Sequence, residues 1–269
     1  MAARALTIAF SPCPNDTFVF HGLVHGFVSL PGFAPRAELL DIEELNLRAR
    51  DPARAHPISK MSVATFAAVR DRYVLLDAGA ALGRGCGPLV VALPGAIEGG
   101  LAGLAGRRVA IPGAGTTAAL LLRRFAPRDV QPVAMRFDAI MPAVVAREVD
   151  AGVVIHEGRF TYEALGLQAL ADLGVLWEEA TGLPLPLGVV AALAALGDDV
   201  IRRIDAALRA SVELARARPE LSREFVRAHA QELSEEVCRQ HIELYVNEFT
   251  VALGVEGRRA IEQLVRAAS

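Results

Sequence analysis

One histidine stands where a catalytic base could act. His156 directly follows the apolar run "AGVVI" (151–155), which is typical of a buried strand, so its side chain is expected at the end of that strand. An imidazole can accept a proton near pH 7, which makes general base catalysis the first chemistry to consider. The position alone is equally compatible with a structural histidine that hydrogen-bonds to the backbone.

Polar residues follow three other apolar runs in the same way. These stretches are "SPCPND" (11–16), "SKMS" (59–62) and "GAGTT" (113–117), and His156 begins a fourth, "HEGRF" (156–160). In open α/β sheets, ligands bind outside the carboxyl ends of the strands, and the N-termini of the following helices attract anions. Taken together, the four corners predict a site for a small organic acid.

Each corner also has a purely local explanation. Asn15 or Asp16 is expected to cap a helix that starts at Thr17. Ser62 and Thr116 are expected to cap the two helices that follow them. The two prolines of "SPCPND" fix φ and remove N–H donors, so they stiffen the first corner.

The sequence predicts neither a nucleotide cofactor nor a metal. No lysine follows the second glycine of "GAGTT", and its spacing is not that of a dinucleotide fingerprint. His21 and His25 lie one helical turn apart, but no third ligand presents itself. Cys13 has no adjacent base that would activate it as a nucleophile.

Composition and charge exclude several classes of partner. The chain has 269 residues, a net charge of −3 and a pI near 6.1, which does not suggest a nucleic-acid binder. No apolar run approaches the roughly 20 residues that span a membrane. Three scattered cysteines and a start, "MAARALTIAF", without a signal peptide favour the cytoplasm. The apolar helical tail leaves room for a homodimer.

Alternation of strand and helix patterns predicts an α/β fold with mostly parallel sheets and a helical C-terminal region. Two valine-rich strands, 87–93 and 185–193, bracket a middle block with its own strand–helix order. We therefore expect a discontinuous large lobe (1–90 and 188–269), an inserted small lobe (91–187) and a ligand cleft between them. A single doubly wound sheet with a helical tail is the alternative.

Four motifs carry a family resemblance. "FSPCPNDTFVFHGLVHG", "SKMS", "GAGTT" and "VIHEGRFTY", in this order, resemble the 1,4-dihydroxy-6-naphthoate synthases of the futalosine route to menaquinone. The similarity covers essentially the whole chain, including "TGLPLPLG" and the helical C-terminal third. The resemblance implies the two-lobe fold of type II periplasmic solute-binding proteins, with one lobe inserted into the other.

The resemblance also implies a reaction and a set of site residues. The enzyme would be a lyase that converts cyclic dehypoxanthine futalosine to 1,4-dihydroxy-6-naphthoate and releases dihydroxyacetone, without a cofactor. His156 takes the place of the family's proposed base. The substrate-contacting positions match Lys60, Met61, Ser62, Thr116 and Thr117, with Asn46 on a neighbouring helix and Asp16 shaping the first corner. The alternatives are a non-catalytic solute-binding protein for a small carboxylate and a chorismate dehydratase of the same pathway.

Overall fold

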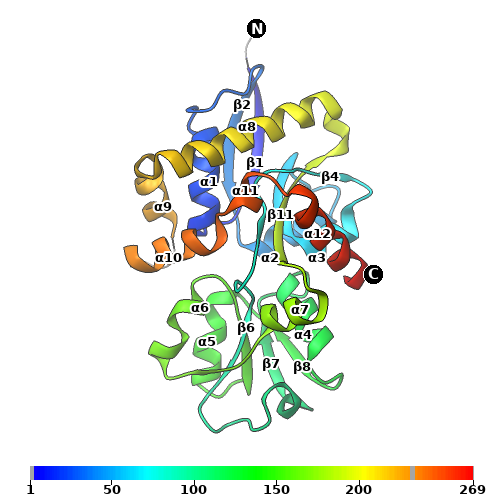
Figure 1. Ribbon diagram of the computed structural model, residues 1–269, viewed down its shortest axis with the longest axis vertical. Helices are drawn as coiled ribbons and strands as arrows, with labels where there is room; N and C mark the ends of the chain where they lie inside the picture. The colour runs from blue at the N-terminus through cyan, green and yellow to red at the C-terminus, as the bar shows by residue number, and fades with distance from the viewer. Residues whose placement is uncertain (1–2, 231–233, 269) are drawn as a thin grey trace. The chain divides into compact units, whose positions relative to one another are not determined.

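A computed structural model describes residues 3–230 and 234–268 (Figure 1). The chain divides into two compact units: unit 1 consists of Met1–Gly83 with Pro186–Ser269, and unit 2 of Arg84–Leu185. The backbone leaves unit 1 once and returns to it once, so unit 2 is an insertion. Each unit has its own sheet, which confirms the two-lobe fold and excludes a single doubly wound sheet.

Unit 1 is built on a sheet with the strand order β2-β1-β3-β11-β4, and β5 pairs with β11. Its strands are β1 (Arg4–Phe10), β2 (Phe33–Leu39), β3 (Ile58–Ser62), β4 (Tyr73–Leu75), β5 (Ala81–Gly83) and β11 (Leu185–Leu193). β1 runs parallel to β2 and β3, but β11 runs antiparallel to β3 and β4. The expectation of mostly parallel strands is wrong at β11, because this strand returns from the inserted unit and not through a helical crossover.

Helices cover the sheet of unit 1, and the C-terminal third is helical as expected. They are α1 (Pro14–Val24), α2 (Ile42–Arg50), α3 (Val63–Val69), α8 (Asp198–Ala217), α9 (Arg223–His229), α10 (Glu235–Tyr245), α11 (Glu248–Val251) and α12 (Gly254–Ala268). α1 packs against α8, α9 and α10, and Figure 1 shows α8 crossing over it. Nearly every residue of α1 is buried, which explains why its apolar side chains are not confined to one face of the helix.

Unit 2 is built on a second mixed sheet with the order β10-β6-β9-β7-β8. Its strands are β6 (Leu89–Ala92), β7 (Arg108–Ile111), β8 (Gln131–Ala134), β9 (Ala151–Val154) and β10 (Gln168–Asp172), and its helices are α4 (Thr117–Phe125), α5 (Phe137–Val145), α6 (Gly158–Thr161) and α7 (Leu173–Thr181). β7 runs parallel to β8 and β9, whereas β6 runs antiparallel to β9 and β10, so the expectation of mostly parallel strands is wrong in this sheet as well. Figure 1 shows α5 and α6 on one side of this sheet, and α4 and α7 on the other. Single 3₁₀ turns in the two units lie at Gly100–Leu104, Tyr162–Leu165, Ala194–Leu196 and Pro219–Ser222.

A glycine lets α5 lie close to the strand that leads to His156. A Cβ atom built on Gly152 would lie 2.4 Å from Cγ2 of Ile140 and 3.0 Å from Cγ2 of Val144, both on α5. Ile140 and Val144 are fully buried in the core of unit 2. The missing side chain at Gly152 therefore fixes the distance between α5 and β9, and with it the corner that follows β9.

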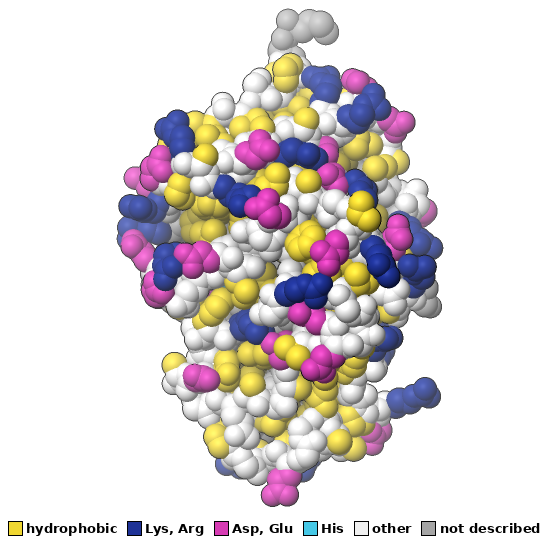
Figure 2. Space-filling model, viewed as in Figure 1, with side chains coloured by type: hydrophobic (Ala, Val, Ile, Leu, Met, Phe, Trp, Pro, Cys, Tyr) yellow, Lys and Arg dark blue, Asp and Glu magenta, His cyan; other side chains and the backbone are white. Residues whose placement is uncertain are grey.

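The surface mixes charges of both signs. On the face shown in Figure 2, lysine and arginine side chains are interspersed with aspartate and glutamate. Within residues 3–230 and 234–268, no helix is both long and apolar enough to cross a membrane.

Candidate active site

The first two polar corners meet in unit 1. β1 and β3 are parallel neighbours, so the residues that end them lie at the same edge of the sheet. Nζ of Lys60 lies 3.0 Å from Oδ1 of Asp16, and both side chains are almost fully buried. Lys60 also donates to the carbonyl oxygen of Gly79 at 2.8 Å. The ammonium group is thus held by two acceptors in the interior of unit 1.

Asp16 does not cap a helix, and the expectation that Asn15 or Asp16 would do so is wrong. α1 begins three residues earlier than expected, at Pro14, because proline is well suited to the first helical position. Asp16 therefore lies in the first turn, where the helix dipole stabilises a negative charge. Its carboxylate accepts hydrogen bonds from Oγ of Ser11 at 2.7 Å and from Nδ2 of Asn15 at 2.9 Å.

Asn46 holds Ser62 from the neighbouring helix α2. Nδ2 of Asn46 donates to Oγ of Ser62 at 3.0 Å, and the backbone N–H of Ser62 donates to Oδ1 of Asn46 at 2.9 Å. Ser62 occupies the N-cap position of α3 as expected, but its side chain makes no capping bond, because Oγ is engaged by Asn46 instead. Met61, between Lys60 and Ser62, is fully buried.

The other two corners lie together in unit 2. β7 and β9 are parallel neighbours, so "GAGTT" and His156 follow the same edge of the second sheet. Gly113 has φ of +127°, a conformation that favours glycine. Thr116 caps α4, which confirms its predicted role: Oγ1 accepts from the N–H of Ala119 at 3.1 Å and donates to the carbonyl oxygen of Gly113 at 2.8 Å. Thr117 is the buried first residue of α4.

His156 has an unusual backbone conformation. Its φ is +54°, in the left-handed region that non-glycine residues seldom adopt. Such strain is typically retained at functional sites. The imidazole is half-buried, and the ring of Phe137 meets it edge-on with 4.9 Å between the ring centroids. Phe137 is the first residue of α5, so the close packing of α5 on β9 also positions this aromatic contact.

An arginine anchors the same corner. Arg159 donates through Nη1 to the carbonyl oxygen of Gly87 at 2.6 Å and through Nη2 to Oδ2 of Asp172 at 2.7 Å. Asp172 in turn caps α7 by accepting from the N–H of Gly174. Burial raises the pKa of the nearby Cys86 thiol to about 12, so this thiol stays protonated and is not a nucleophile.

Sequence reasoning missed Glu157, which directly follows the expected base. Its side chain is only 6% exposed, although glutamate is rarely buried without a partner. Nothing in the letters "HEGRF" distinguishes a buried glutamate from an exposed one. The signal is available only from the structure.

The described residues include no group of three or more histidine, cysteine, aspartate or glutamate side chains arranged to hold a metal ion. His21 and His25, which have metal-like spacing, stack on each other with 4.4 Å between ring centroids. These two histidines therefore pack against each other.

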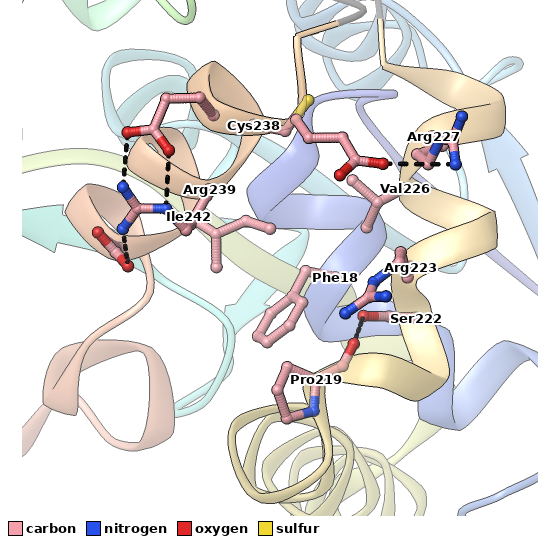
Figure 3. Close-up of a pocket in the computed structure, with 12 residues that line it drawn as sticks. Phe18, Pro219, Ser222, Arg223, Val226, Arg227, Cys238, Arg239 and Ile242 are labelled. Carbon is pink, nitrogen blue, oxygen red and sulfur yellow. Dashed lines mark hydrogen bonds and ion pairs between the residues drawn. The ribbon is translucent and has the colours of Figure 1, made fainter.

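A hollow of about 850 Å³ lies elsewhere in unit 1, between α1, α9 and α10 (Figure 3). Apolar side chains of Phe18, Val226 and Ile242 line it. Arg239, at its rim, is paired with the carboxylates of Glu236 and Glu243. None of the expected site residues is among its described lining residues, so we do not assign the chemistry to it.

Comparison with known proteins gives a consistent result. A family model described as menaquinone biosynthesis matches residues 6–269. A Thermus thermophilus protein named 1,4-dihydroxy-6-naphthoate synthase is 51% identical over 262 residues, which cover 97% of this chain and 93% of that protein. A Streptomyces coelicolor protein of the same name is 48% identical over 276 residues, which cover 100% of this chain and 94% of that protein.

Solved structures agree with the fold. The crystal structure of an Archaeoglobus fulgidus protein has a TM-score of 0.90 at 35% identity, covering 98% of this chain and 96% of that chain. A periplasmic aliphatic sulphonate binding protein from Escherichia coli has a TM-score of 0.66 at 15% identity, covering 98% and 91% of the two chains. At that identity, the second likeness shows the fold alone, which is the expected periplasmic-binding-protein fold.

Proposed function

The chain belongs to the menaquinone biosynthesis family, and from this premise we propose that it is a 1,4-dihydroxy-6-naphthoate synthase. The observation that carries the proposal is the near full-length identity of about one residue in two to two relatives that bear this name. The activity is that of a carbon–carbon lyase: cyclic dehypoxanthine futalosine is converted to 1,4-dihydroxy-6-naphthoate, and dihydroxyacetone leaves.

His156 is the proposed general base. It would take a proton from a hydroxyl-bearing carbon of the substrate's sugar-derived ring. Ring opening and cleavage of the carbon–carbon bond follow, the three-carbon fragment leaves, and formation of the aromatic naphthoate drives the last steps. Support comes from its place after β9, its strained backbone and the edge-on contact with Phe137. A general base typically accelerates a reaction by about 10²–10⁴-fold.

The N-terminus of α4 is the proposed site for the substrate carboxylate. The backbone N–H groups of a helix's first turn and the positive end of its dipole favour an anion. Thr116 donates its hydroxyl proton to Gly113 and accepts from Ala119, so it would act by holding the turn in shape. Thr117, at the first helical position, would contact the carboxylate together with these N–H groups.

The polar cluster of unit 1 is proposed to supply further substrate contacts. Asp16 and Asn46 fix the donors Lys60 and Ser62 in place before any ligand arrives. Ser62 accepts from Asn46 through Oγ, so its own hydroxyl proton is available to a substrate oxygen. Met61 would act through packing between these two donors, because it is fully buried. Preorganised donors lower the cost of binding.

Location and assembly belong to the same proposal. The three cysteines are buried and lie far apart in the sequence, a usage typical of proteins from a reducing compartment, and we place the enzyme in the cytoplasm. A homodimer built through the helical C-terminal region stays a prediction.

The proposal is tested by incubating the purified protein separately with cyclic dehypoxanthine futalosine and with chorismate, and separating the products by chromatography. We expect naphthoate and dihydroxyacetone in equal amounts from the first compound and no reaction of the second. Release of the first compound unchanged supports a solute-binding protein, and dehydration of chorismate supports the sister enzyme. Either result rejects the proposal.

A further inference from the structure

Glu157 has a buried carboxylate oxygen for which the described residues supply no hydrogen bond. Oε1 is buried and has no hydrogen-bond partner within residues 3–230 and 234–268. Glu157 immediately precedes α6, but its side chain makes no capping bond to that helix. Its backbone carbonyl oxygen accepts from the N–H of Phe160 at 2.9 Å and from the hydroxyl of Thr161 at 3.3 Å. The side chain of Glu157 therefore makes no hydrogen bond that stabilises the described local fold.

The nearest cation in the sequence does not pair with this carboxylate. Arg159, two residues further on, gives its guanidinium to Gly87 and Asp172. Burying a carboxylate oxygen without a partner costs free energy, and native proteins satisfy the large majority of such atoms. An exception inside a folded domain points to a donor from outside the described part of the chain.

The position of Glu157 says where that donor would come from. It directly follows His156, the residue with the strained backbone at the end of β9. A molecule that brings a carbon within reach of the imidazole also brings its neighbouring groups to this corner. The substrate of the proposed function carries hydroxyl groups on its sugar-derived ring, and each hydroxyl is a donor.

We infer that Glu157 is a substrate-binding residue that accepts a hydrogen bond from a hydroxyl of the substrate's sugar-derived ring. The inference rests on the proposed function and adds to it the orientation of the bound substrate. Like charges repel, so the carboxylate of the substrate lies away from Glu157 and toward the N-terminus of α4. The sugar-derived ring then faces His156, as proton removal from one of its carbons requires.

Two substitutions and one matched control test the inference. Glu157→Gln keeps the size of the side chain and removes its charge, and Glu157→Met removes the acceptor as well. Glu179→Gln, an exposed position on α7 in the same unit, is the control. For each protein we would measure kcat and KM with cyclic dehypoxanthine futalosine, and the thermal unfolding midpoint without ligand.

The expected result separates binding from folding. A hydrogen bond to a charged group contributes substantially to the free energy of substrate binding. We therefore expect kcat/KM to fall by about tenfold or more in Glu157→Gln, mainly because KM rises, and to fall further in Glu157→Met. The unfolding midpoint of the ligand-free variants stays the same or rises, because an unsatisfied buried charge is removed. Glu179→Gln changes neither quantity.

Three results would overturn the inference. Unchanged kcat/KM in both Glu157 variants, with an active wild type, shows that the carboxylate does not touch the substrate. A midpoint lowered by several degrees, or a variant that fails to fold, shows that the carboxylate is structural. A wild-type protein without turnover instead rejects the proposed function, and the inference falls with it.

Discussion

The buried ion pair of Lys60 and Asp16 joins the first two polar corners of unit 1. Both side chains are almost fully buried, so removing one partner leaves an uncompensated charge in the interior. We expect Lys60→Met to lower the free energy of unfolding by about 3–5 kcal/mol in urea titrations. The double variant with Asp16→Asn should recover part of this loss. Equal stability of wild type and Lys60→Met would contradict the account.

The sequence predicted these residues unevenly. His156 and Thr116 were found from their places after strands, because a strand end and a helix start leave clear local patterns. The pairing of Lys60 with Asp16 was not predicted, because the two residues are distant in the chain and only the parallel pairing of β1 with β3 brings them together. Glu157 was missed because burial at a corner depends on tertiary packing.

At the scale of elements, the packing of α5 on β9 positions the proposed base. Gly152→Ala would place a methyl group 2.4 Å from Cγ2 of Ile140, so this side chain must move, and we expect α5 to shift with it. We expect an overpacking cost of about 1–3 kcal/mol and a lower kcat, since Phe137 on α5 would move relative to His156. Urea unfolding and steady-state kinetics measure the two effects. Gly166→Ala is not a suitable control, because a side chain at a residue with φ of +71° strains the backbone. Ala139→Gly is the better control, since it changes a residue of α5 without adding volume.

Protonation of His21 is expected to destabilise the folded protein in acid. The ring of His21 on α1 stacks with those of His25 and Phe27, and burial first, then the neighbouring His25, lowers its pKa below 6.5. Below pH 6.5 the unfolded chain therefore binds a proton that the folded protein resists, so the free energy of unfolding falls as the pH falls. We expect the free energy of unfolding of His21→Gln to fall less than that of the wild type between pH 7.5 and about pH 5.5, roughly one unit either side of an ordinary histidine pKa. An identical pH dependence in both proteins would contradict this.

Element boundaries show why pattern reading has limits. The strands that end in polar corners were recognised, but β5 and β10 were not. β5 has only three residues, all buried, and β10 has five residues of which none is fully buried, so neither shows a clear periodicity. The start of α1 was placed too late, since Asn15 and Asp16 are common capping residues and hid the role of Pro14.

For the whole molecule, the inserted two-lobe fold was predicted and the direction of β11 was not. Apolar strands alternating with helices indicate separate α/β units, and the family resemblance indicated how they are connected. An apolar run does not encode whether a buried strand runs parallel or antiparallel to its neighbour. Strand direction at β11 depends on the return path from unit 2, which is a property of the complete chain.

Ligand binding should stabilise the folded protein as a whole. A product that binds only the folded state, present at about 100 times its Kd, raises the free energy of unfolding by about 2.7 kcal/mol. We expect 1,4-dihydroxy-6-naphthoate to raise the thermal unfolding midpoint in wild type and in His156→Ala alike, because the base is not needed for binding. Benzoate at low concentration is the control for a non-specific carboxylate effect. No shift with the naphthoate at any concentration would argue against the proposed site.

The central claim is that His156 removes the proton that starts the reaction. The most direct measurement is the rate of naphthoate formation, followed by mass spectrometry, for wild type and His156→Ala under saturating cyclic dehypoxanthine futalosine. The account predicts that kcat falls by about a hundredfold or more in the variant. Equal rates in the two proteins would contradict it.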